Sequence, residues 1–113
     1  METTQAVQSL GALAQGSRLS IFRLLVQAGA AGMSAGSIGE KLALPPATLS
    51  FHLAGLTRAG LARGRQEGRF IIYSADFDGM GRLLAYLTED CCGGKACVPM
   101  PIQFVGKKQR KRA

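Results

Sequence analysis

The hydrophobic pattern of this chain changes period at Gly60, and that change limits the folds open to it. Before Gly60, apolar residues recur at helical spacing. This spacing predicts four helices, over residues 6–14, 17–28, 34–42 and 46–59. After it, the short segments Leu61–Arg65 and Phe70–Ala75 flank Gly68, which can adopt the positive φ of a tight hairpin turn. A last helical stripe runs from Phe77 to Leu87. The expected fold is mainly α with a small β-hairpin.

Local signals predict where these helices begin and end. Ser17 is a candidate N-cap of the second helix, and the third helix is expected to start at Ser34. Pro46 is acceptable in the first turn of the fourth helix, and Gly60 is a C-terminal stop. The residues expected to face the core from the fourth helix are Leu49, Leu53 and Leu56. The second helix is apolar around most of its circumference, so we expect it at the centre of the core.

Length and composition exclude several classes of protein. The chain has 113 residues, enough for one compact domain, and 47% hydrophobic against 19% charged residues is typical of a folded protein. No apolar run is long enough to span a bilayer, and residues 1–14 lack the pattern of a secretory leader. No carboxylate pair or Ser-His-Asp set is present to support catalysis. We therefore expect a cytoplasmic protein that is not an enzyme and needs no catalytic cofactor.

Positive charge is concentrated in two places. The net charge is +7, and five of the fourteen basic residues lie within residues 107–112, a basic tail that solubilises the chain or contacts polyanions loosely. Four more arginines fall within twelve positions around the predicted hairpin. They are Arg58, Arg63, Arg65 and Arg69. This second cluster lies in an organised region and is the better candidate for a functional surface.

Two consecutive helices followed by an arginine-rich hairpin are typical of a winged helix-turn-helix. The helix over 46–59 would enter the major groove of DNA by its N-terminal part, and the hairpin would contact phosphates or the minor groove. The candidate DNA-binding residues are Thr48, Ser50, Phe51, His52, Arg65 and Arg69. Each also has a simpler interpretation, since hydroxyls and arginines are common on exposed surfaces and His52 suits a half-buried packing position.

A longer stretch of the same region resembles a known family. Residues 48–61, with Ser50-Phe51-His52-Leu53 followed by Ala54-Gly55-Leu56, resemble the recognition-helix signature of the ArsR/SmtB metal-sensing repressors. Residues 17–25 resemble that family's second helix, and Glu67-Gly68-Arg69 with Tyr73-Ser74 resembles its wing. The resemblance covers about residues 5 to 90. It implies a homodimeric winged helix that represses its own operon until an inducer binds.

Dimerisation is also expected from the apolar stripes on the first and last helices. A body of about ninety residues can hardly bury both stripes by itself. Pairing them across a two-fold axis would bury them and would space two recognition helices about one DNA turn apart. We therefore expect a palindromic operator. The chain divides into a DNA-binding and dimerisation domain over residues 1–90, and a thiol-containing inducer segment with a basic tail over residues 91–113.

All three cysteines of the chain, Cys91, Cys92 and Cys97, lie within seven residues of one another. A disulfide between the adjacent Cys91 and Cys92 would need a strained ring, so the pair is better suited to chelation. Gly93-Gly94 lets the backbone turn so that Cys97 can bring a third sulfur to the same centre. Structural zinc needs four ligands, and the only histidine, His52, lies in the predicted recognition helix. A soft three-coordinate ion fits better: trivalent arsenic, As(III), or antimony, Sb(III).

The family's usual sensing sites are absent from this chain. The helix before the recognition helix, residues 37–43, has no cysteine, and residues 76–90 have no histidine. The arrangement instead resembles the arsenic repressors in which a vicinal cysteine pair and a third cysteine follow the last helix. That resemblance implies that As(III) releases the repressor from operator DNA. The choice between arsenite, antimonite and methylated As(III) stays open, because a methylated species needs only two thiols.

Two other functions use the same residues. A redox-sensing repressor of the same fold would signal through sulfenic acid or an intersubunit disulfide of these thiols. A metal-carrying or assembly protein would use the winged helix for protein contacts, although Arg63, Arg65 and Arg69 favour a polyanion as the partner.

Overall fold

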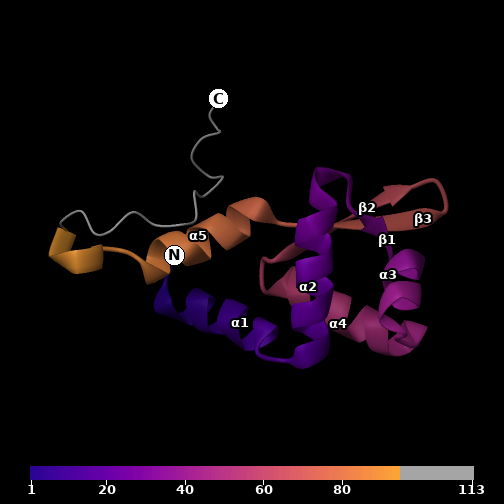
Figure 1. Ribbon diagram of the computed structural model, residues 1–113, viewed down its shortest axis with the longest axis horizontal. Coiled ribbons are helices and arrows are strands. Elements are labelled where there is room, and N and C mark those ends of the chain that lie inside the picture. Colours follow the sequence, from indigo (N-terminus) through magenta and orange to yellow (C-terminus); the bar gives the residue numbers. More distant parts are fainter. Residues whose placement is uncertain (95–113) are drawn as a thin grey trace.

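The computed structural model describes residues 1–94 as a winged helix (Figure 1). The described elements are α1 (Thr3–Leu13), α2 (Gly16–Ala28), η1 (Gly29–Ala31), β1 (Met33–Ser34), α3 (Ala35–Leu42), α4 (Pro46–Arg58), β2 (Ala62–Glu67), β3 (Phe70–Ala75), α5 (Phe77–Leu87) and η2 (Cys91–Gly94). The predicted fold class and order of elements are confirmed. Among these helices, none has the length and apolar character needed to cross a membrane.

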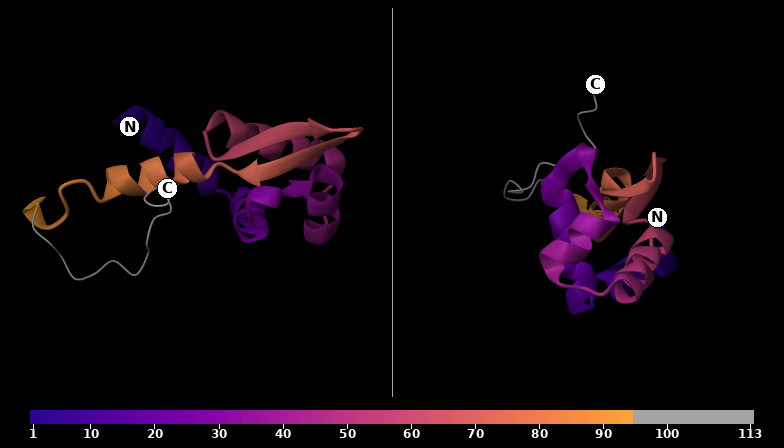
Figure 2. Two further views of the ribbon diagram at one scale, coloured as in Figure 1. Left: turned by 90° about the horizontal axis from the view of Figure 1, so that it is seen from above. Right: turned by 90° about the vertical axis from the view of Figure 1, so that its right-hand side faces the viewer.

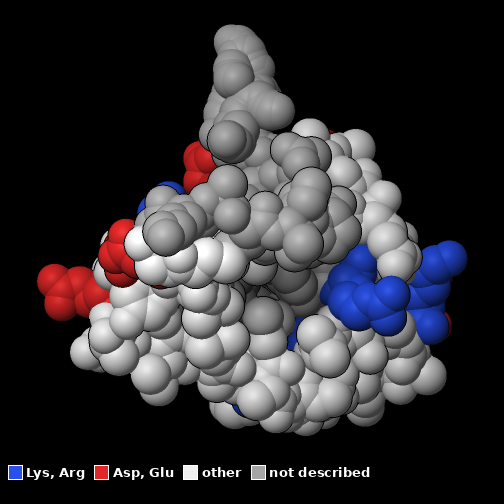
Figure 3. Space-filling model, turned by 60° about the vertical axis from the view of Figure 1, so that its left-hand side comes forward, with Lys and Arg blue, Asp and Glu red and all other residues white. Residues whose placement is uncertain are grey.

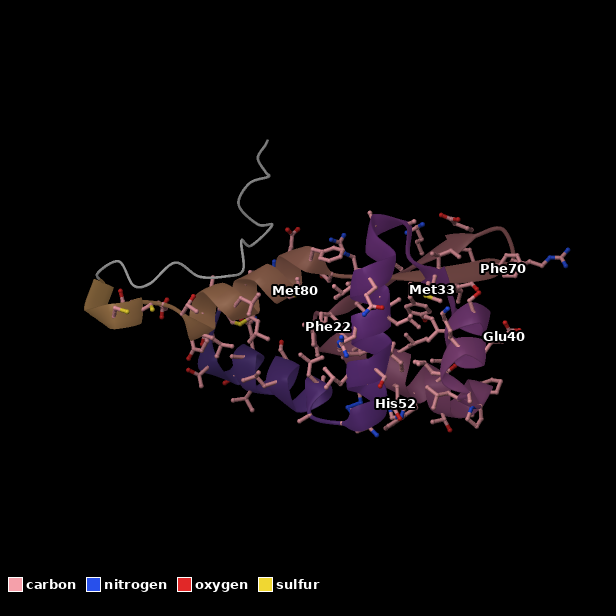
Figure 4. The ribbon with its side chains drawn as sticks, in the orientation of Figure 1. Phe22, Met33, Glu40, His52, Phe70 and Met80 are labelled. Atoms are coloured by element: carbon pink, nitrogen blue, oxygen red, sulfur yellow. The ribbon has the colours of Figure 1, made fainter. Side chains whose placement is uncertain are left out.

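Helix α2 is the centre of the core, as its apolar circumference predicts. Ile21 and Leu25 on α2 are fully buried and pack with side chains from α3, α4 and β2. Figure 4 shows Phe22 of α2 and Met80 of α5 directed into the same interior. The predicted core face of α4 is confirmed. Its residues Leu49, Leu53 and Leu56 are 4%, 2% and 0% exposed.

The helix caps agree with the predictions at one site and differ at another. The Ser34 hydroxyl accepts a hydrogen bond from the backbone N–H of Ser37, so Ser34 is the N-cap of α3, at the position where that helix is predicted to start. Helix α2 begins at Gly16, and its N-cap is Gln15, whose side-chain oxygen accepts from the N–H of Arg18 at 2.9 Å. The prediction that Ser17 caps α2 is wrong, because Ser17 already lies inside the first turn.

The sheet has one strand more than the predicted hairpin. Strand β1 pairs antiparallel with β3, placing Met33 opposite Tyr73, and the strand order is β1-β3-β2. Gly32, which precedes β1, has φ +73°, and a Cβ there would collide with the carbonyl oxygen of Tyr73. Glycine at this position therefore permits β1 to approach the hairpin and attach the wing to the helical body.

Two glycines of α5 provide a matched test of how this helix packs. A Cβ at Gly79 would collide with the carbonyl oxygen of Gly60, whereas a Cβ at Gly81 would meet no atom within 4 Å. We expect Gly79→Ala to lower the free energy of unfolding by about 1.5 kcal/mol through overpacking. Gly81→Ala should raise it by about 0.5 kcal/mol, since alanine is the better helix former. Urea denaturation measures both, and equal effects would contradict the described packing of α5 on the turn after α4.

Candidate nucleic-acid interface and thiol turn

Burial of one side of α4 leaves its other side facing solvent. Thr48, Ser50 and Phe51 are exposed near the N-terminal end of this helix, and Phe51 is 63% exposed. Pro46 occupies the first turn, where the absence of its N–H costs no helical hydrogen bond. The exposed side of α4 thus presents two hydroxyls and one large aromatic ring to a partner.

Phe51 is held by two neighbours in spite of its exposure. The guanidinium carbon of Arg18, from α2, lies 6.0 Å from the centre of the Phe51 ring, within cation–π range. The His52 ring lies edge-on to it, with the ring centres 5.6 Å apart and an angle of 62° between the planes. These contacts support the aromatic ring from beneath and leave its outer surface accessible.

His52 does not join the exposed side chains of α4. It is 7% exposed, because position 52 shares the inner side of the helix with Leu49, Leu53 and Leu56. Figure 4 shows it where α4 passes α2. Its Nδ1 is buried and has no hydrogen-bond partner within residues 1–94. The structure therefore places His52 with the packing residues on the inner side of α4, beside Phe51, and DNA contact by its imidazole stays a prediction.

The two predicted arginines of the wing have different surroundings. Arg65 donates from Nε to the Glu67 carboxylate at 2.6 Å and from Nη2 to the Ala31 carbonyl at 3.0 Å, which ties β2 to the turn before β1. Arg69 is exposed beside Gly68 at the hairpin turn and makes no hydrogen bond or ion pair with any other described residue. Phe70, 60% exposed, extends the wing tip (Figure 4). All the N–H donors of the Arg69 guanidinium are therefore accessible to a partner. Arg65 has some of its N–H donors bonded to Glu67 and Ala31 and the rest accessible.

Helices α1 and α5 lie together at the other end of the molecule and expose apolar side chains. Val7, Leu10 and Leu87 are 61%, 43% and 51% exposed. The Thr3 hydroxyl and the Tyr86 hydroxyl are 2.6 Å apart and link the two helices. Figure 3, which turns this end forward, shows Asp and Glu side chains on its left, Lys and Arg side chains on its right, and uncharged residues along its lower part. We call Val7, Leu10 and Leu87 the apolar face.

The sulfur atoms of Cys91 and Cys92 lie on a turn directly after α5, which we call the thiol turn. Their Sγ atoms are 3.6 Å apart, and both residues are exposed. The backbone N–H of Cys91 donates to Thr88, and positive φ angles at Cys92 and Gly93 continue the turn. Cys92 is disulfide-bonded. The turn and the wing lie at opposite ends of the molecule (Figure 2).

The third predicted thiol, Cys97, lies outside the described residues. In the part of the chain that the structure describes, no group of three or more His, Cys, Asp or Glu side chains is arranged to hold a metal ion. The described residues therefore contribute two of the three sulfurs expected at the thiol site.

The fold, the exposed side of α4 and the wing together define a winged helix-turn-helix. Residues 13–65 match a family model described as a helix-turn-helix domain. A comparison with curated protein sequences found no match.

Solved structures give a narrower assignment. HlyU from Vibrio cholerae is 34% identical, and the match covers 77% of this chain and 97% of HlyU with a TM-score of 0.61. Its reduced form matches with 29% identity, over 80% and 92% of the two chains, at a TM-score of 0.59. An ArsR-like transcriptional regulator from Rhodococcus is 26% identical over 74% of this chain and 76% of its own, with a TM-score of 0.66.

A fourth structure shows the fold. A homodimeric winged helix-turn-helix DNA-binding domain from Mycobacterium bovis is 24% identical over 85% and 89% of the chains, at a TM-score of 0.63. The chain belongs to the ArsR-like family of winged helix-turn-helix transcriptional regulators. Its similarity to HlyU is the main basis of this assignment. It is a DNA-binding regulator and not an enzyme.

Proposed function

We propose that this regulator is a homodimeric repressor that leaves its operator when trivalent arsenic binds Cys91, Cys92 and Cys97. The observation that carries the proposal is the pair of sulfurs 3.6 Å apart on a turn that continues from α5, one of the two helices bearing the apolar face. In this proposal residues 1–90 bind DNA and pair with a second copy, and residues 91–113 bind the inducer.

Operator contacts are assigned to the exposed side of α4 and to the wing. The hydroxyls of Thr48 and Ser50 donate to phosphates or base edges, and the Phe51 ring contacts thymine methyl groups in the major groove. Arg69 binds phosphate or reaches the minor groove, and Arg65 contributes its remaining donors. The exposure of Thr48, Ser50, Phe51 and Arg69 supports this assignment.

The apolar face supports pairing of two copies. Three large apolar side chains, Val7, Leu10 and Leu87, are 43% or more exposed on helices that are linked to each other. Contact with the same face of a second copy would remove them from water, at about 25 cal/mol for each Å² of apolar surface. The related Mycobacterium bovis domain is homodimeric. Two copies carry two recognition helices, so the operator is palindromic.

The sulfur geometry supports binding of a soft ion. Two thiolates on one tetrahedral ion, each about 2.3 Å from it, lie about 3.8 Å apart. The 3.6 Å between Cys91 Sγ and Cys92 Sγ is close to that separation, so both sulfurs can contact one ion once they are reduced. Trivalent arsenic or antimony takes three sulfurs and needs no further protein ligand. Cys97 completes the set.

A short hydrogen-bonded path joins the thiol turn to the last turns of α5, which carry Leu87 of the apolar face. Cys91 N–H donates to the Thr88 carbonyl, and the Thr88 hydroxyl donates to the Leu84 carbonyl in the last turns of α5. Closing three sulfurs on one ion would therefore pull on the end of α5, beside Leu87. A change there alters how the two copies pair and how their recognition helices are spaced, and a coupling of about 1–3 kcal/mol is usual.

The inducer is tested by titrating arsenite into the complex of reduced protein with operator DNA. We expect arsenite to weaken operator binding of the natural protein about 10-fold, and to leave the Cys91→Ser/Cys92→Ser/Cys97→Ser protein unaffected. Fluorescence anisotropy of labelled DNA measures both. Equal release of DNA from the two proteins would contradict the proposed site.

The Cys97→Ser protein provides the matched control for selectivity. It keeps the vicinal pair, so it should respond to methylarsenite, which needs two thiols, while losing its response to arsenite. Loss of both responses would indicate that Cys97 contributes more than a third sulfur.

Thiol oxidation is a second candidate signal, favoured by the disulfide at Cys92. HlyU, the relative with 34% identity, has also been solved in a form named as reduced. A redox sensor would lose operator affinity on treatment with peroxide and recover it with a thiol reductant, without any metalloid. Arsenite release in the presence of excess phosphine reductant favours the first proposal over this one.

A further inference from the structure

A cationic cavity lies beside the recognition helix, at the junction of α1, α2 and α4. Its volume is about 440 Å³. The residues that line it are Gln8, Ala12, Arg18, Gly55, Arg58 and Ala59. Two guanidinium groups and one amide therefore face a space to which no carboxylate contributes. Neither arginine takes part in an ion pair with another described residue. The cavity is suited to an anion.

Arg18 supplies the specific reason to expect an anionic ligand. Its Nε is buried, yet it has no hydrogen-bond partner among residues 1–94. Leaving a buried charged donor without an acceptor is unfavourable, so such groups usually have a partner that the protein alone does not show. Gly55 has no side chain, so the Arg18 side chain can lie close to the backbone of α4. A Cβ at position 55 would lie 3.6 Å from Arg18 Cδ. The guanidinium thus lies against α4 beside Gly55, and its buried Nε has no acceptor among residues 1–94.

The cavity is continuous with the side of α4 that faces DNA. Phe51, Gly55 and Arg58 are spaced four and three residues apart, so they follow one side of the helix. Arg18 both lies within cation–π range of the Phe51 ring and lines the cavity. An anion bound between Arg18 and Arg58 would therefore lie next to the base that Phe51 contacts.

We propose that Arg18 and Arg58 bind a backbone phosphate of the operator and fix the depth of α4 in the major groove. This inference rests on the operator binding proposed above. Arginine donors match phosphate oxygens in pairs, and contacts of this kind position a protein on DNA. The same chemistry would also accept a free phosphate ion, and the experiment separates the two sources.

The salt dependence of operator binding is the decisive measurement, because it counts phosphate contacts. Each phosphate contact contributes about 0.9 to the slope of log K against log of salt concentration. We expect Arg18→Met and Arg58→Met each to reduce the slope, with a loss of about 0.9 in the double variant, and each to weaken binding about 10-fold at low salt. The matched control is Arg23→Met, which removes the same charge from an exposed position of α2 that does not line the cavity.

The outcomes separate this inference from the proposed function. If the natural protein binds no palindromic duplex, the proposed function is wrong, since it requires operator binding. If it binds, and the slopes for Arg18→Met and Arg58→Met equal that for Arg23→Met, the phosphate site is wrong. Inorganic phosphate provides the third outcome. If it raises the melting temperature of the natural protein but not that of Arg18→Met, and the salt slope of DNA binding is unchanged in Arg18→Met, the cavity binds a free anion and the operator contact is wrong.

Arg58 is exposed, so Arg58→Met carries the test even if Arg18→Met folds poorly.

Discussion

Replacing Leu10 and Leu87 together with glutamate is expected to convert the dimer into monomers and to weaken operator binding about 100-fold. These leucines are 43% and 51% exposed, so the monomer tolerates the change, but a two-fold interface would have to bury four carboxylates. Each monomer then binds a single half-site of the operator and loses the affinity that simultaneous binding of the second half-site gives the dimer. Sedimentation gives the oligomeric state, and DNA titration gives the affinity.

The chain offers a matched control for that result. Leu19, on α2, is also 43% exposed and is not part of the apolar face. Leu19→Glu should remain dimeric and keep its operator affinity within about twofold, as is usual for surface substitutions. A dimeric Leu10→Glu/Leu87→Glu protein would show that the two copies pair through another surface.

Pairing through the apolar face also explains how a signal could reach DNA. The thiol turn and the wing lie at opposite ends of the molecule, so no direct contact between inducer and DNA is available within one copy (Figure 2). Helix α5 begins directly after β3 of the wing and ends just before the thiol turn. A displacement of α5 changes both the pairing of copies and the base of the wing. The proposed mechanism therefore requires the dimer, and the monomeric variant should lose its response to arsenite together with its affinity.

The sequence predicted those parts of the fold that depend on local patterns. The helical spacing of Leu49, Leu53 and Leu56 and the position of Gly68 are properties of short segments, and they place α4 and the hairpin correctly. Strand β1 has two residues and no alternation to detect, and it exists because Gly32 allows it to approach β3. The cap of α2 differs because Gln15 can reach the N–H of Arg18, an alternative that serine preference at N-caps does not reveal.

The candidate site residues also divide into those that local sequence predicts and those that depend on contacts between distant segments. The cysteine cluster is a local feature of the sequence, and so are the exposed hydroxyls of α4. The inward position of His52 follows from its place beside Leu49 and Leu53 on the buried side of the helix, which the family signature alone does not indicate. The pairing of Arg18 with Phe51 joins two helices that are distant in sequence, so no spacing rule predicts it. Arg18 and Arg58 became candidates only when the packing of α2 against α4 was known.

Replacing Phe51 with alanine is expected to weaken operator binding about 30-fold. This factor corresponds to about 2 kcal/mol, the free energy gained when one large aromatic side chain is buried. Phe51 is 63% exposed and supported by Arg18 and His52, so the free protein loses little packing when the ring is removed. The same substitution should remove the ability to distinguish thymine from uracil, because these bases differ only by the methyl group that the ring contacts. Titrating operators in which single thymines are replaced by deoxyuridine measures this directly.

At the thymine that Phe51 contacts, deoxyuridine should weaken binding by the natural protein about fourfold for each methyl removed, and should not change binding by Phe51→Ala. Phe70→Ala is the control, since Phe70 is 60% exposed but lies on the wing and not on α4. This variant should retain the preference for thymine at the same position. If the natural protein binds every deoxyuridine operator as tightly as the thymine operator, Phe51 makes no methyl contact, and the exposed ring must act through the shape of the groove or through the phosphate held beside it.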